Sequence, residues 1–67
     1  MKLYRLITGI DDSEFCHRVT QALNKGWDLS GSPTMAYDAT RGATICGQAV
    51  TKDAKGQYSP DIKLGEY

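Results

Sequence analysis

The side chains of this sequence that can do chemistry are chiefly aromatic rings and cations. Tyrosine rings stack on flat ligands, arginine and lysine bind anionic groups, and a glutamine amide hydrogen-bonds polar ones. Six residues of these types form the candidate ligand site: Tyr4, Arg5, Tyr37, Arg41, Gln48 and Lys52. The same tyrosines also fit ordinary strand and rim positions, so their residue type alone leaves both interpretations open.

No combination of residues typical of a catalytic or metal site is present. His17, the only histidine, falls on the polar side of a predicted helix, with no partner placed for general-base chemistry. Cys16 and Cys46 lie within predicted elements, so we interpret both as buried thiols without metal-ligand spacing. We therefore predict a protein that is not an enzyme and needs no cofactor or metal. A site assembled between subunits is the one enzymatic alternative.

Gln48 is a polar amide in a predicted central strand, between Gly47 and Ala49. A buried amide needs hydrogen-bond partners. The irregular segment Gly31–Pro33 can supply them, which is the interpretation we favour. Contact with a ligand or with another subunit is the alternative.

A helix is predicted over residues 12–25. Asp11 is placed as its N-cap, with Glu14 at the third helical position as in a capping box. Ile10 and Phe15 then occupy the two positions of a hydrophobic staple. These assignments give Asp11, Glu14 and Phe15 structural roles.

The end of the same helix carries a second local signal. Gly26 stands where a left-handed residue ends a helix, and Trp27 follows as the apolar residue that folds back on the last turn. The apolar stripe that should face a sheet consists of Phe15, Val19, Ala22 and Leu23.

Three stretches have the composition of strands: Lys2–Thr8, Trp27–Asp38 and Ala43–Lys52. Pro33 interrupts the second, because proline lacks the N–H that a central strand donates, and can split it in two. The predicted fold is α+β, with one helix packed on a three- to four-stranded antiparallel sheet in the order β-α-β-β.

The predicted strands are apolar on both faces. In the first strand Leu3 and Ile7 alternate with Tyr4 and Leu6, and the last strand behaves in the same way. One helix covers only one face of a sheet, and a 67-residue chain has little core of its own. We therefore favour a homo-oligomer; the alternative explanation is an uncertain strand register in a small, twisted sheet.

The charge is balanced, with eight basic and eight acidic residues and a net charge of zero. Nucleic acid and anionic membranes are therefore unfavoured partners. The sequence contains neither an apolar run of membrane-spanning length nor a signal peptide, so we expect a cytoplasmic protein. Residues 1–52 are predicted to form the single domain. Residues 53–67 form a tail that is either frayed or docked on the domain or a neighbouring subunit.

The run from Tyr4 through Lys52 resembles the small bacterial and phage family called domain of unknown function 1737. The resemblance rests on the first strand, the apolar helix positions and two segments, namely Tyr4, Leu6, Ile7, Phe15, Val19, Leu23, Gly26–Pro33 and Gly47–Lys52. It implies the same fold and a bacterial or phage origin, and no catalytic residues, because the family has no established activity.

The residues and the resemblance together leave two candidate functions. The first is a non-catalytic homo-oligomer that sequesters a small nucleotide-type ligand at its subunit interfaces, in the bacterial or host cytoplasm. The alternative is an accessory module that binds another protein through an exposed sheet face or edge.

Overall fold

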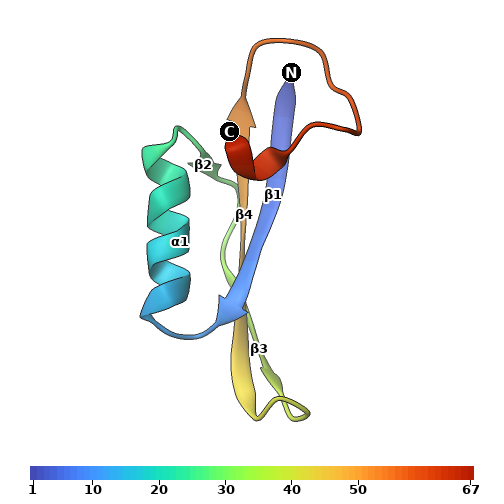
Figure 1. Ribbon diagram of the computed structural model, residues 1–67. Coiled ribbons are helices and arrows are strands. Elements are labelled where there is room, and N and C mark those ends of the chain that lie inside the picture. The colour runs from blue at the N-terminus through green and yellow to red at the C-terminus, as the bar shows by residue number, and fades with distance from the viewer.

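A long antiparallel pair, β1 (Lys2–Ile10) and β4 (Ala43–Asp53), is the centre of the structure. The structure is a computed structural model that describes residues 1–67. β4 is the central strand, with β1 on one side and β2 (Asp28–Leu29) and β3 (Thr34–Asp38) on the other (Figure 1). The helix α1 (Ser13–Asn24) packs on one face. The predicted α+β fold and the order β-α-β-β are confirmed, with the second strand split in two.

The helix side of the sheet holds the core. Side chains that face one another across an antiparallel ladder share a face, so Ile7 and Gln48 lie together, as do Arg5 and Val50. The buried core consists of Leu3, Ile7, Ala22, Trp27 and Val50. The alternation expected from the sequence is therefore the one that the structure has.

The C-terminus of α1 forms a complete Schellman motif. The Trp27 amide donates to the Ala22 carbonyl at 3.1 Å, and the Gly26 amide donates to the Leu23 carbonyl at 3.1 Å. Gly26 has a φ of 95°, a conformation that glycine adopts without steric cost. This turn delivers the Trp27 side chain into the core, where it is 1% exposed.

The start of α1 differs from the prediction by one residue. The N-cap is Asp12 and not Asp11, and the Asp12 carboxylate accepts from the Phe15 amide at 3.1 Å. The Asp11 amide still donates to the Thr44 carbonyl of β4 at 2.9 Å, so the sheet ladder holds the chain until Asp12 can turn. Glu14 becomes the second helical residue, and the staple is absent because Ile10 is exposed.

The helix stripe is also narrower than predicted. Phe15 and Val19 pack against the core and Ala22 is buried, but Leu23 is exposed. Cys16, predicted to be buried, is exposed as well, whereas Cys46 is buried as expected. The physical reason is that α1 lies mainly over β1, so only the side chains directly above that strand are covered.

The segment of residues 30–33 is a bulge that splits the second strand. Leu29 pairs with Val50 and Thr34 pairs with Gly47, so four residues of one strand lie opposite Gln48 and Ala49 of the other. Two extra residues leave the alternation of side chains unchanged, because the period of a strand is two. Pro33 lies in this bulge, where no ladder hydrogen bond is required of it.

The tail, residues 54–67, folds back over the end of the sheet where β1 begins and β4 ends (Figure 1). Both termini lie at this end. A short 3₁₀ turn, η1 (Leu64–Glu66), carries Leu64 against the core, and Ile62 and Tyr67 pack beside it. The tail therefore supplies part of the cover of the core. No helix of the structure combines the length and the apolar character needed to cross a membrane.

Candidate functional site

Two of the predicted ligand-binding cations are engaged inside the molecule. The Arg5 guanidinium lies over the Trp27 ring, 5.4 Å from its centroid, as a cation–π contact. The Lys52 ammonium donates to the Lys25 carbonyl at the end of α1 at 2.6 Å and to the Tyr67 carbonyl at 2.8 Å. Both side chains therefore have partners within the fold, and Lys52 ties the helix to the tail.

Gln48 makes the contact that we favoured for it. Its side chain is 5% exposed, and its amide nitrogen donates to the Gly31 carbonyl at 3.2 Å and to the Ala49 carbonyl at 2.9 Å. The bulge of residues 30–33 cannot pair regularly with β4, so its carbonyl needs a side-chain donor. Gln48 supplies that donor.

We expect Gln48→Met to lower the free energy of unfolding by about 1–3 kcal/mol, because it keeps the side-chain volume but leaves the Gly31 carbonyl without its donor. Urea unfolding followed by circular dichroism measures the loss. Gln21→Met, on the exposed surface of α1, is the matched control and should change little. Equal stability of the two variants would show that the bulge does not depend on this hydrogen bond.

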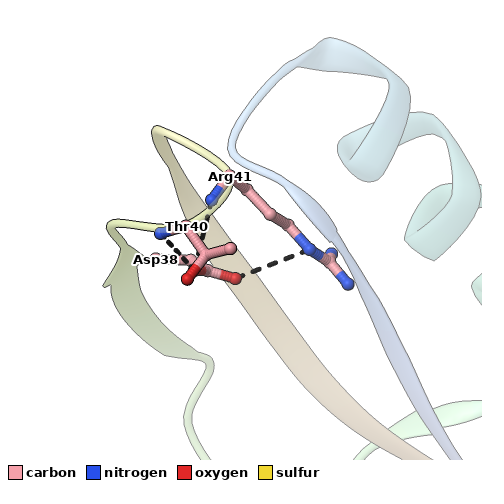
Figure 2. Close-up of polar contacts among 3 residues, drawn as sticks. All are labelled: Asp38, Thr40 and Arg41. Atoms are coloured by element: carbon pink, nitrogen blue, oxygen red, sulfur yellow. Dashed lines mark hydrogen bonds and ion pairs between the residues drawn. The ribbon is translucent and has the colours of Figure 1, made fainter.

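The hairpin that joins β3 to β4 holds two more candidates, Tyr37 and Arg41, both exposed. In its turn, the Asp38 carboxylate accepts from the amides of Thr40 and Arg41 at 3.0 and 3.3 Å. The Arg41 guanidinium lies 3.5 Å from the same carboxylate, as Figure 2 shows. This ion pair is solvated and weak, so Arg41 remains accessible to an anion.

The last candidate, Tyr4, lies on the face of the sheet opposite the helix, which we call the open face. On β1 this face carries the side chains of the even-numbered residues, and Tyr4, Leu6 and Ile10 are 57%, 55% and 52% exposed. Lys2, which was not among the predicted ligand residues, lies beside Tyr4 on the same face. A lysine at the start of a strand carries no signal of binding in the sequence. No element of the chain covers this row.

Gly47 lies in the middle of the open face for a local reason. A Cβ at this position would come within 2.8 Å of the Thr34 hydroxyl and within 3.6 Å of the Leu6 side chain. The glycine is therefore required by the neighbouring strands of its own sheet. A closely approaching second backbone is not needed to explain it.

A second exposed apolar row lies on the helix side of the sheet, beyond the cover of α1. Leu29 shares a face with Val50, and Met35 and Tyr37 share that face with Cys46 and Thr44. Leu29, Met35 and Tyr37 are all exposed, because α1 lies over β1. We call these three residues the β3 row.

The six predicted ligand residues do not form one site. Arg5, Gln48 and Lys52 contribute to the helix-side interior, Tyr37 and Arg41 belong to the far hairpin, and Tyr4 stands on the open face. The one surface depression lies in the tail, lined by Asp61, Ile62, Lys63, Glu66 and Tyr67, and contains none of them. No group of three or more potential metal ligands is gathered anywhere in the structure.

The two thiols differ in their surroundings. Burial, and then the nearby Asp11 carboxylate, raise the pKa of the Cys46 thiol above its usual value. A neutral buried thiol is a poor nucleophile. Both cysteines are free, and Cys46 is a buried apolar residue close to Asp11 and Asp12 at the start of α1.

Comparison with known proteins identifies the family and nothing further. The model of the family described as Domain of unknown function (DUF1737) matches residues 1–53, which include every strand and the helix. No curated protein and no solved structure matches the chain significantly. The chain belongs to the DUF1737 family.

Proposed function

We propose that this member of the DUF1737 family is a non-catalytic binding protein that acts as a homo-oligomer and holds a small anionic, nucleotide-type ligand between its subunits. The observation that carries the proposal is the open face, where Tyr4, Leu6 and Ile10 stand in one row, each more than half exposed.

The case for self-association is one of missing core. Only eight of 67 residues are buried, and a domain of this size is marginally stable from its own burial. Exposed apolar side chains that stand singly need no explanation, but three on one strand of an uncovered sheet face, interrupted only by Thr8, are typical of an interface. A second subunit that contacts this row adds burial that the single chain lacks.

The case for an anionic, flat ligand rests on what remains free near that face. The Tyr4 ring is exposed and can stack on a base, and the neighbouring Lys2 ammonium can bind a phosphate. On the hairpin, Tyr37 and Arg41 supply the same pair of groups, with Tyr37 on the helix-side face. Arg5, Gln48 and Lys52 are left out of this proposed site because internal contacts engage them.

The test combines light scattering with thermal unfolding in the presence of cyclic mono- and dinucleotides. We expect an oligomer at micromolar concentration, and a rise in Tm with at least one nucleotide. A ligand at a hundredfold excess over its Kd adds about 2.7 kcal/mol, which raises the Tm on the order of 10 °C for a small domain. Tyr4→Ala should abolish the rise, whereas Tyr58→Ala in the exposed tail should leave it. A monomer, or no response to any nucleotide, overturns the proposal.

A second function is favoured by the β3 row. Leu29, Met35 and Tyr37 form an exposed apolar strip along an edge of the sheet, which is the geometry by which an accessory module binds another protein. A chain that stays monomeric, with both apolar rows uncovered, would support this function over the first.

We place either function in the cytoplasm of a bacterium, or of a host cell if the chain is encoded by a phage. The two unpaired cysteines support a reducing compartment.

A further inference from the structure

β1 has one side without a partner. It pairs only with β4, so its other side is a free edge of the sheet. At the two ends of the β1–β4 ladder, the Asp11 amide donates to the Thr44 carbonyl and the Ala54 amide donates to the Met1 carbonyl. Because hydrogen-bonded positions alternate in an antiparallel ladder, odd-numbered residues of β1 bond inward and even-numbered residues direct their N–H and C=O groups outward.

This edge has few of the devices that usually protect an edge strand. β1 is nine residues long, contains no proline, and keeps an unbroken register with β4. One outward group is occupied: the Arg18 guanidinium of α1 donates to the Thr8 carbonyl at 2.6 Å. No loop, turn or side-chain hydrogen bond of the chain engages the other outward groups, from Lys2 to Ile10.

We propose that a second copy of this chain pairs antiparallel with this edge, about a twofold axis at Leu6. Even-numbered residues must then face even-numbered residues. An axis at Leu6 uses the whole strand, with Lys2 opposite the partner's Ile10. An axis at Arg5 would place two guanidinium groups opposite each other, which is unfavourable. Axes at Tyr4 or Ile7 would shorten the pairing.

The charges along β1 favour a second copy as the occupant of this edge. The strand begins with Lys2 and leads directly into Asp11 and Asp12. Antiparallel pairing brings the Lys2 end of each strand beside the acidic end of the other, and the twofold axis repeats this contact. The Thr8 carbonyl has two lone pairs, so it can accept from the partner's Tyr4 amide and keep its bond to Arg18.

The pairing deepens the proposed function, and rests on it for the existence of an oligomer. It joins the two open faces into one, with Tyr4 and Leu6 of both copies on the same surface. It also brings the Lys2 end of each β1 to the end of the joined sheet that carries the partner's β3–β4 hairpin, because that hairpin lies beyond the end of β1 (Figure 1). Tyr4 and Lys2 of one copy then lie on the open face at the end of the dimer that carries the partner's hairpin, whereas the Tyr37 side chain of that hairpin belongs to the helix-side face.

Cross-linking through a single new cysteine tests the position of the axis. Directly opposed hydrogen-bonded residues have Cα atoms about 5.5 Å apart, which a disulfide spans. In a Cys16→Ser background with buried Cys46 retained, Leu6→Cys should form a covalent dimer on mild oxidation. Thr8→Cys alone should not form a covalent dimer, because the two new cysteines at position 8 lie about four residues apart along the paired strands. A mixture of Thr8→Cys and Tyr4→Cys chains should cross-link, because these two positions face each other. Cross-linking of Thr8→Cys to itself in preference to Leu6→Cys overturns this register.

Two further variants test the edge itself by light scattering. Leu6→Pro removes an outward N–H without touching the β1–β4 ladder and should make the chain monomeric, whereas Leu6→Ala should still dimerise. Lys2→Glu should raise the dimer Kd about tenfold at low salt and less at high salt. Lys55→Glu makes the same change of charge in the exposed tail and should leave the dimer Kd unchanged. If Leu6→Pro folds and stays oligomeric, edge pairing is overturned while the oligomeric function stands; a monomeric wild type overturns both.

Discussion

Trp27→Ala is expected to lower the free energy of unfolding by about 3–5 kcal/mol, which is most of what so small a domain has. The Trp27 ring is 1% exposed, fills the space between α1 and the sheet, and carries the Arg5 guanidinium on one face. Truncation therefore leaves a large cavity and an unsupported cation. Far-UV circular dichroism during urea titration measures the loss, since the variant has no tryptophan left to report by fluorescence.

Trp27→Phe is the informative control for that result. The Trp27 indole Nε1 is buried without a hydrogen-bond partner, so phenylalanine removes volume and also an unsatisfied donor. We expect Trp27→Phe to cost well under half as much as Trp27→Ala. A Trp27→Ala chain that unfolds within about 1 kcal/mol of the wild type would mean that another element fills the position of the ring.

Deleting the residues after Asp53 is expected to cost about 3 kcal/mol, roughly 1 kcal/mol for each of three half-buried apolar side chains. Ile62, Leu64 and Tyr67 pack against the core, and the Tyr67 carbonyl is one of the two acceptors of Lys52. For a domain of 60–100 residues this corresponds to a fall in Tm of more than about 10 °C. A thermal melt of residues 1–53 measures it.

The same deletion separates the family's own residues from the remainder of this chain, because the DUF1737 model matches residues 1–53. Leu64→Ala in the full chain should reproduce part of the loss, and Tyr58→Ala, at an exposed position, should not. An unchanged Tm for residues 1–53 would show that the tail contributes no stability to the fold.

Features with local causes were predictable from the sequence. Gly26 and Trp27 form the C-terminal motif of α1 because the left-handed conformation and the apolar contact involve only neighbouring residues. The alternation in β1 placed Leu3 and Ile7 together on one face and Tyr4 and Leu6 on the other, since the period of a strand is two. Which of these faces the helix covers did not follow from the alternation.

Features that depend on where α1 lies were not predictable in this way. The N-cap moved from Asp11 to Asp12 because β4 holds the Asp11 amide, a partner distant in sequence. Cys16 and Leu23 are exposed because the helix sits over β1 and covers a narrow strip. Neither fact has a signal in the residues around it.

The candidate ligand residues show the same division most clearly. By residue type, Arg5, Lys52 and Tyr4 were equivalent members of one predicted site. The sheet register sends Arg5 and Lys52 to the helix side, where Trp27 and two carbonyls engage them, and leaves Tyr4 on the open face. The elements, their order and the presence of two apolar faces could be predicted, because these follow from spacing along the chain. Which side chains remain free to bind could not be predicted, because it depends on contacts between residues far apart in sequence.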